Sequence, residues 1–139
     1  MRVVGVDLGS RRIGIAVSDV SGTIASPVTV ILRCGNRDVD HASIAAVVAE
    51  LEAERVVVGL PLSLSGEMGP AARAAGEEAE AMARVLHVPI ETFDERLTTV
   101  AADAILMSRG MRADARRRVV DKVAAAVMLQ SWLDSRMQR

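Results

Sequence analysis

The first third of the chain shows the hydrophobic pattern of β-strands. Apolar, mostly β-branched residues run almost without interruption over Arg2–Leu8, Ile13–Ser18 and Thr23–Leu32, with a break at Pro27. The near-continuous run over Arg2–Leu8 is typical of a strand that is buried on both faces. The segments between them are short, which predicts antiparallel hairpins.

The rest of the chain alternates between helical spacing and strands. The expected order is a helix through Ile44–Leu51 with Asn36 or Asp38 as its cap, a strand at Arg55–Leu60, a loop at Pro61–Gly69, a helix through Ala75–Leu86, a strand at Val88–Phe93, a helix at Thr98–Arg109 ended by Gly110, and a helix from Asp114 to about Arg136. Strands that alternate with helices imply parallel neighbours joined by right-handed crossovers. The sequence therefore predicts an α/β fold with a mixed five-stranded sheet, three antiparallel strands followed by parallel ones, flanked by helices.

Size and composition fit one globular domain over residues 1–139. Half of the 139 residues are apolar and a quarter are charged. Cys34 is the only cysteine, so no internal disulfide can form, as expected in a reducing compartment. No apolar run approaches the roughly 20 residues that span a bilayer, and no signal peptide precedes the first strand. We therefore expect a soluble, cytoplasmic protein.

Acidic residues stand where the predicted topology brings chain segments together. Asp7 lies near the carboxyl end of the first strand, which should be central, and Asp94 and Glu95 follow the last strand at the same edge of the sheet. Asp121 shares a helical face with apolar residues that should pack on the sheet. A carboxylate on such a face needs a cation or a hydrogen-bond donor.

Carboxylates that converge on one point repel one another unless a cation lies between them. Mg²⁺ prefers a few carboxylates together with water and phosphate oxygens. Two such ions about 4 Å apart can activate a water and stabilise the leaving oxygen of a phosphodiester. The acids therefore favour a hydrolase for nucleic acids, with Mg²⁺ or Mn²⁺ as its cofactor.

Each acid also has a purely structural interpretation. Asp7 can cap the turn that follows it, Asp94 or Glu95 can cap the next helix, and Asp121 can pair with a neighbouring arginine. Taken singly, these interpretations are the simpler ones, but three acids on converging elements favour a site.

Other chemistries have weaker support in the sequence. His41 and His87 lack metal-ligand spacing and are expected to be isolated surface or loop residues. Ser10 has no histidine partner, so a nucleophilic triad is not expected. With one Phe, one Trp and no Tyr, the chain cannot bind nucleic acid through rows of stacked aromatic side chains.

Basic residues supply the counterpart to the acids. The formal net charge is −1, so attraction to a polyanion must come from local clusters. All but one of the basic residues are arginines, which bind phosphate through two parallel hydrogen bonds, although a GC-rich genome produces the same bias. A solvated charged surface is the alternative interpretation. In the nucleic-acid-binding interpretation, we expect contacts with the nucleic-acid backbone from Arg11, Arg12, Arg96, Arg116, Arg117 and Lys122.

Four segments together resemble the YqgF family, also called RuvX, whose members are RNase H-like proteins related in fold to the resolvase RuvC. They are GVDLGSRRIGIAVSD, VVGLPLSLSGEMGP, FDERLTT and DKVAAAVMLQSWL, and they extend over residues 5–133. The resemblance implies an RNase H-like fold and a metal-dependent nuclease. It also implies that Asp7 and Asp121 bind metal directly and that Glu95 completes the metal shell or orients the water, with Asp94 as the reserve for that role.

The resemblance names two substrates and does not choose between them. Family members are associated with maturation of the 5′ end of the 16S ribosomal RNA precursor and have also been proposed to resolve Holliday junctions. We expect the RNA activity first, with precursor rRNA or branched DNA as partner, the small ribosomal subunit as a further one, and a monomer or homodimer. The loop Ser63–Gly66 departs from the family's Asn- and Asp-containing pattern, so no catalytic residue is placed there.

Two other classes of protein fit parts of the sequence. A non-catalytic nucleic-acid-binding module would keep the fold without cleaving its ligand. An ATP-handling enzyme is the other, because VDLGSRRIGIAV also resembles the phosphate-binding hairpin of actin-like kinases and chaperones. Those proteins need two such domains around the nucleotide, and 139 residues supply one.

Overall fold

The structure, a computed structural model, describes residues 1–61, 69–94 and 113–137, and in the last helix it describes the side chains of residues 123–136. Its elements are β1 (Val3–Leu8), β2 (Arg12–Ser18), β3 (Ala25–Leu32), α1 (Arg37–Glu50), β4 (Arg55–Leu60), α2 (Pro70–Ala83), β5 (Ile90–Asp94) and α4 (Ala113–Met137). The predicted helix at Thr98–Arg109 and most of the predicted loop at Pro61–Gly69 lie outside the described residues. None of the described helices is long and apolar enough to cross a membrane.

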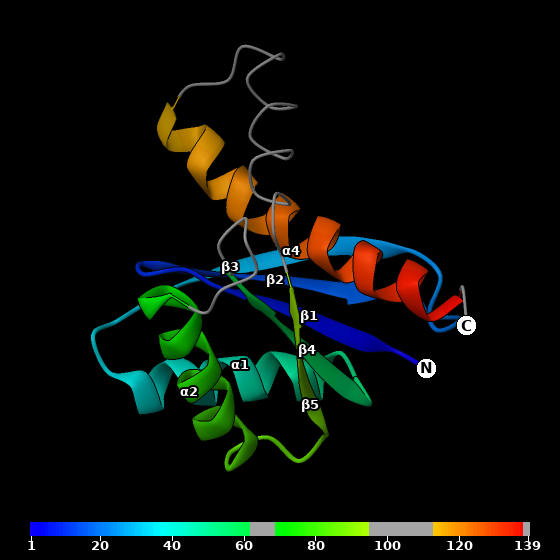
Figure 1. The fold of residues 1–139 in the computed structure, drawn as a ribbon, viewed down its shortest axis with the longest axis horizontal. Helices are drawn as coiled ribbons and strands as arrows, with labels where there is room; N and C mark the ends of the chain where they lie inside the picture. Colours follow the sequence, from blue (N-terminus) through cyan, green and yellow to red (C-terminus); the bar gives the residue numbers. More distant parts are fainter. Residues whose placement is uncertain (62–68, 95–112, 138–139) are drawn as a thin grey trace.

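The five strands form one sheet in the order β3-β2-β1-β4-β5, with β1 at its centre (Figure 1). β1 pairs antiparallel with β2, and β2 with β3. β4 runs parallel to both β1 and β5. The predicted mixed sheet is therefore confirmed, and the carboxyl ends of β1, β4 and β5 meet at one edge.

β3 is an edge strand and accommodates Pro27 without breaking. Pro27 lies opposite Ala16, and the register between the two strands shifts between Ile15 and Ala16. A β-bulge at this point lets the strand continue, and proline is tolerated at an edge because one side of the strand has no partner.

The turn between β2 and β3 is organised around Asp19. Its carboxylate accepts hydrogen bonds from the Ser21 hydroxyl at 2.6 Å and from the amides of Thr23 and Ile24 at 2.7 and 3.1 Å. These hydrogen bonds, that of Ser21 foremost, lower the pKa of Asp19 to about 2. Because the turn takes up both amides, β3 begins at Ala25 rather than at the predicted residue 23.

α1 and α2 cover one face of the sheet (Figure 1). The side chain of Asn36 accepts the amides of Asp38 and Val39 and caps α1, which confirms one of its two predicted caps. α2 ends at Ala83, earlier than predicted, yet Leu86 is still buried. The core of this layer consists of Val4, Val6, Ile13, Ile15, Ile44, Val48, Ala53, Val56, Val58, Ala79, Met82 and Leu86.

α4 lies across the opposite face of the sheet (Figure 1). Ala125, Met128 and Trp132 are buried together, as their spacing predicts. The helix begins at Ala113, one residue before Asp114, where its start was expected. The strand residues at the core of this second layer are Val3, Ala16 and Val57.

The backbone of α4 approaches β1 most closely over Gly5. A Cβ atom on Gly5 would lie 2.9 Å from Cβ of Leu129 and 3.4 Å from the carbonyl oxygen of Ala125. The first of these distances is shorter than packed carbon atoms tolerate. The helix can therefore rest at this depth only because residue 5 has no side chain.

Gly5→Val should lower the free energy of unfolding by about 1–3 kcal/mol, because the added side chain must displace α4. Valine favours strands more than glycine does, so a loss measured by urea denaturation reports the contact with the helix. Gly69→Ser is the control, since a Cβ at Gly69 meets no atom of the described residues within 4 Å. Unchanged stability of Gly5→Val would contradict the close approach of α4.

Candidate active site at the end of the central strand

Asp7 is the predicted site residue that the structure describes best, and it lies on the face covered by α4. Side chains alternate along a strand, and Val4 and Val6 belong to the core beneath α1 and α2, whereas Val3 belongs to the core beneath α4. Asp7 therefore shares the face of Val3 and Gly5. It is half-buried near the carboxyl end of the central strand, as the sequence predicts.

Glycines flank Asp7 on both neighbouring strands. Gly14 of β2 is its direct cross-strand partner. On the other side Val6 pairs with Val58, so Gly59 is the next residue of β4 alongside Asp7. Neither neighbour has a side chain that would fill the space beside the carboxylate. A carboxylate supplies the oxygen ligands that Mg²⁺ and Mn²⁺ prefer, and the two glycines add no competing side chain, so the described residues fit the implied metal.

The path of α4 relates Asp121 to Asp7. Leu133 lines a hollow with Val3, whereas Ala125 and Leu129 lie over Gly5. The helix therefore runs backwards along β1 as its residue number rises. One helical turn advances about 5.4 Å and two strand residues about 6.6 Å. Each turn of α4 therefore passes about two residues of β1.

Asp121 precedes Ala125 by one helical turn, so its backbone lies on the part of α4 that leads toward the end of β1 where Asp7 stands. The side chain of Asp121 is outside the described set.

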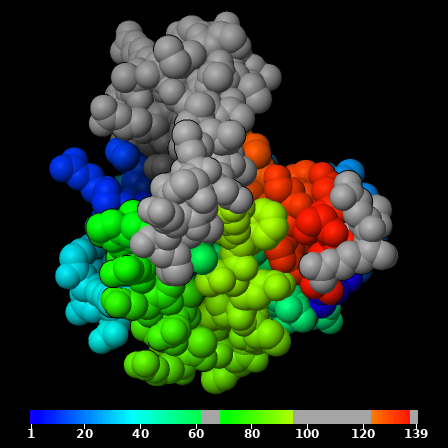
Figure 2. Space-filling model, viewed as in Figure 1, coloured from blue at the N-terminus to red at the C-terminus, as the bar shows by residue number. Residues whose placement is uncertain are grey.

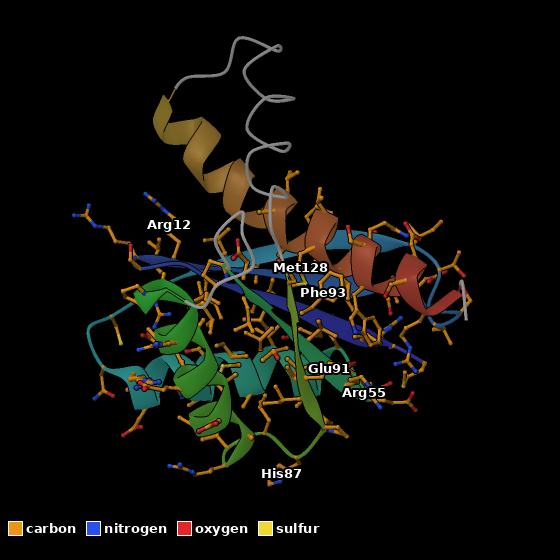
Figure 3. The ribbon with its side chains drawn as sticks, in the orientation of Figure 1. Arg12, Arg55, His87, Glu91, Phe93 and Met128 are labelled. Atoms are coloured by element: carbon orange, nitrogen blue, oxygen red, sulfur yellow. The ribbon has the colours of Figure 1, made fainter. Side chains whose placement is uncertain are left out.

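Asp94 shares the edge of Asp7 but not its face. Phe93 packs into the core beneath α4, and Figure 3 shows it near Met128. Ile90 packs into the core on the other face. The alternation along β5 therefore assigns Asp94 to the face of α2. Glu95 lies outside the described residues. Among the residues that are described, no three Asp, Glu, His or Cys side chains come close enough to hold a metal ion together.

The predicted basic residues are placed in part. Arg11 is exposed in the turn between β1 and β2, and Arg12, half-buried, begins β2. Figure 3 shows Arg12 at one end of the sheet and Arg55 at the other. The side chains of Arg96, Arg116, Arg117 and Lys122 lie outside the described set.

A buried ionic network beside the turn after Asp7 was not predicted. Both terminal nitrogens of Arg33 donate to the two oxygens of Glu78 at 2.9 Å. Nε of Arg33 donates to the carbonyl oxygen of Gly9 at 2.8 Å. Arg33 thus connects α2 to the turn that follows β1.

The prediction that His41 is an isolated surface residue is wrong. Its side chain is 2 % exposed, and its Nε2 lies 2.8 Å from Oε2 of Glu78. The ionised carboxylate of Glu78 can only accept, so Nε2 carries the proton of this hydrogen bond. The prediction failed because it looked only for metal-ligand spacing. A signal was present in the sequence, since Glu78 interrupts the apolar helical stripe of Ala75, Ala79 and Met82.

The comparisons with known proteins agree with this geometry. Thermus thermophilus RuvC, solved in complex with a Holliday junction substrate, aligns with a TM-score of 0.61 over 99 % of this chain and 96 % of its own, at 21 % identity. At that identity the likeness establishes the fold, which is RNase H-like as the sequence resemblance implies.

A family model described as "RuvX: Holliday junction resolvase" matches residues 1–135. The chain therefore belongs to the RuvX family and to the nucleases. Similar proteins include those of Mycobacterium sp. (strain KMS), 48 % identical over 97 % of this chain and 80 % of the relative, and Chloroflexus aggregans, 47 % identical over 96 % and 94 %. A third, from Anaeromyxobacter dehalogenans, is 48 % identical over 98 % of both chains. All three are named "Putative pre-16S rRNA nuclease".

Glu78 should make the stability of the protein depend on pH below about 4.5. Burial by itself raises the pKa of Glu78, but the hydrogen bonds from Arg33 and His41 outweigh it and lower the pKa below the ordinary 4.5. A carboxylate with a lowered pKa stabilises the fold fully above its unfolded-state pKa, and this contribution disappears as the pH falls through the folded-state pKa.

Glu78→Gln should therefore unfold with a free energy about 1–3 kcal/mol lower than wild type at neutral pH, and the difference should shrink below pH 4.5. Urea denaturation at a series of pH values measures both curves. Asp19 also titrates in the acid range, but it is present in both proteins and cancels in the difference. A constant difference down to pH 2 would show that Glu78 does not contribute as an ionised group.

Proposed function

We propose that this nuclease is metal-dependent and processes the 5′ end of the 16S ribosomal RNA precursor in the cytoplasm. The observation that carries the proposal is the position of Asp7, at the end of the central strand, on the face of α4 and between two glycines. The names of the three relatives support the substrate. The small ribosomal subunit is the partner that would present such a precursor.

The proposed metal ligands are Asp7 and Asp121, and Glu95 completes the site. Asp94 is the weaker candidate for the third position, because strand alternation turns it toward α2. A divalent ion bound here supplies a Lewis acid and an activated water. The chain's own part is to hold Asp7 on a rigid central strand and to bring Asp121 toward it on α4, which the packing over Gly5 fixes in depth.

Recognition of the substrate depends on its backbone more than on its bases. Trp132 is 4 % exposed and Phe93 packs against the core beneath α4. They are the only Trp and Phe in the chain, and it has no Tyr. Of these side chains, only the partly buried Phe93 is left for base stacking, the usual means of reading single-stranded RNA. Arginine contacts with phosphates position a strand without reading its sequence.

Resolution of Holliday junctions is the second candidate, and the family description favours it. A junction has two-fold symmetry, so a resolvase is expected to act as a symmetric dimer with two sites. Processing of an RNA end has no such requirement. A non-catalytic binding module is the candidate of another class.

Asp7→Asn, Glu95→Gln and Asp121→Asn should each reduce Mg²⁺- or Mn²⁺-dependent cleavage by at least about a hundredfold, because each removes a charge from the proposed metal site. Asp94→Asn should keep cleavage within about threefold of wild type. Cleavage of an end-labelled RNA carrying the 16S precursor leader, followed on gels, measures all four variants.

Asp134→Asn is the matched control, because this exposed acid lies near the other end of α4. Melting temperatures show whether each variant is folded. Full activity of folded Asp7→Asn would refute the metal site. Loss of activity in Asp94→Asn with full activity in Glu95→Gln would exchange the roles of these two residues.

The RNA leader should be cleaved faster than a four-way DNA junction by the same protein with the same metal. The ratio of kcat/KM for the two substrates measures this preference. Paired, symmetric cuts in the junction at a higher kcat/KM would establish the resolvase instead. Tight binding of both without cleavage, with and without EDTA, would establish the binding module.

A further inference from the structure

A basic hollow opens beside the turn between β1 and β2. Its volume is about 600 Å³. It is lined by the turn itself, the end of β3 and the start of α1, in particular by four arginines and one aspartate: Arg11, Arg12, Arg33, Arg37 and Asp40. In the space-filling view the turn, in blue, projects from the body of the molecule at the left (Figure 2).

The arginines that line the hollow do not contribute equally to its positive charge. Arg33 is held by Glu78, so its charge is largely balanced. Arg11 and Arg37 are exposed. The first amides of α1 are not the attractive element, because the side chain of Asn36 already accepts two of them. An anion in the hollow would therefore be bound by guanidinium groups.

The network around Arg33 fixes the shape of the hollow. The backbone amide of Arg33 donates to the carbonyl oxygen of Arg11 at 2.9 Å, and Nε of Arg33 donates to the carbonyl oxygen of Gly9. Asp40 accepts the amide of Cys34 at 3.1 Å, which ties the segment before α1 to the helix. The turn with Arg11 and the start of α1 with Arg37 are thus both held by hydrogen bonds to the segment of Arg33 and Cys34. A site held in this way needs little rearrangement to bind its ligand.

We propose that this hollow is a second contact site for the substrate, which binds backbone phosphates of the nucleic acid away from the bond that is cut. Arginine-rich linings are suited to phosphate, and no Phe, Tyr or Trp lines the hollow, so no base can stack on such a ring there. The inference rests on the proposed nuclease function for the identity of its ligand.

The hollow is distinct from the candidate active site, although both lie at the same edge of the sheet. Asp7 pairs with Gly14, and Arg12 lies two residues further toward the edge. Asp7 faces α4, whereas Arg37 and Asp40 line the hollow from the start of α1 on the other side of the sheet. Arg12 shares the strand face of Asp7 by alternation, so it lies between the two places. A strand bound at both places passes over the β1–β2 turn, so the turn separates cleavage from anchoring.

The test is a salt titration of binding in EDTA, where no metal-dependent cleavage occurs. The probes are a labelled single-stranded RNA with the precursor leader and a DNA of the same sequence. Arg11→Gln and Arg37→Gln should each weaken binding about five- to tenfold at about 50 mM salt, and each should reduce the slope of log affinity against log salt by about 0.7, the value for one phosphate contact on a single strand. Arg84→Gln, an exposed arginine at the end of α2, is the control of equal charge.

Equal losses on RNA and DNA, with Arg84→Gln unchanged, would support backbone recognition in the hollow. A loss of affinity in Arg84→Gln as large as in the hollow variants would show that the effect comes from net charge alone, and it would overturn the proposal. Wild-type affinity of the Arg11→Gln, Arg37→Gln double variant would also overturn it, as would a loss on RNA alone. Both arginines are exposed, so melting temperatures should not change.

The same assay separates this inference from the proposed function. Asp7→Asn should bind as wild type in EDTA, and the hollow variants should retain kcat at saturating RNA while KM rises. Cleavage by Asp7→Asn would refute the metal site and leave the binding measurements in the hollow intact. Normal binding by the hollow variants, with inactive Asp7→Asn, would refute only the hollow.

Discussion

The close packing of α4 on β1 over Gly5 is the contact on which the arrangement of the candidate site depends. A helix normally stands about 10 Å from a sheet because side chains on both surfaces separate the backbones. Here the strand contributes no side chain at residue 5, and the helix contributes Ala124, Ala125 and Ala126 in the same region. The proposed metal site requires this small spacing, because carboxylate side chains are short. The dense core beneath α4 thus sets the distance between the helix and β1 at the candidate site.

The other face of the sheet is stabilised in a different way. There, large aliphatic side chains form the core, and a charged network of Arg33, Glu78 and His41 lies at its margin. Buried ion pairs contribute little net stability, because desolvation offsets their attraction. What this network provides is a fixed geometry: its hydrogen bonds connect β3, α1 and α2 to the loop after β1. The protein thus combines an apolar contact that sets the depth of one helix with a polar one that sets the position of a turn.

The order of strands and their directions could be predicted from the sequence, because apolar runs and helical stripes alternate clearly and short turns leave few topologies. The edge position of Asp7 followed from the same reasoning. The face of the sheet on which Asp94 lies could not be predicted, because a shift of one residue along the strand reverses the alternation of side chains. The end of a short strand cannot be located to within one residue from composition. Glu78 and His41 are 37 residues apart in sequence, and Arg33 stands in the segment between β3 and α1. The local sequence pattern contains no information about a contact between such distant residues. An acid within an apolar helical stripe does, however, indicate that the acid has a partner.

Pro27 and its bulge affect more than the course of β3. An edge strand exposes unpaired amides and carbonyls, which are a template for joining the sheet of another molecule. A proline lacks the amide, and a bulge disturbs the spacing of the remaining groups. The opposite edge, β5, is only five residues long. A sheet that continues across two molecules is thus disfavoured at β3, and at β5 it could extend over only a few residues.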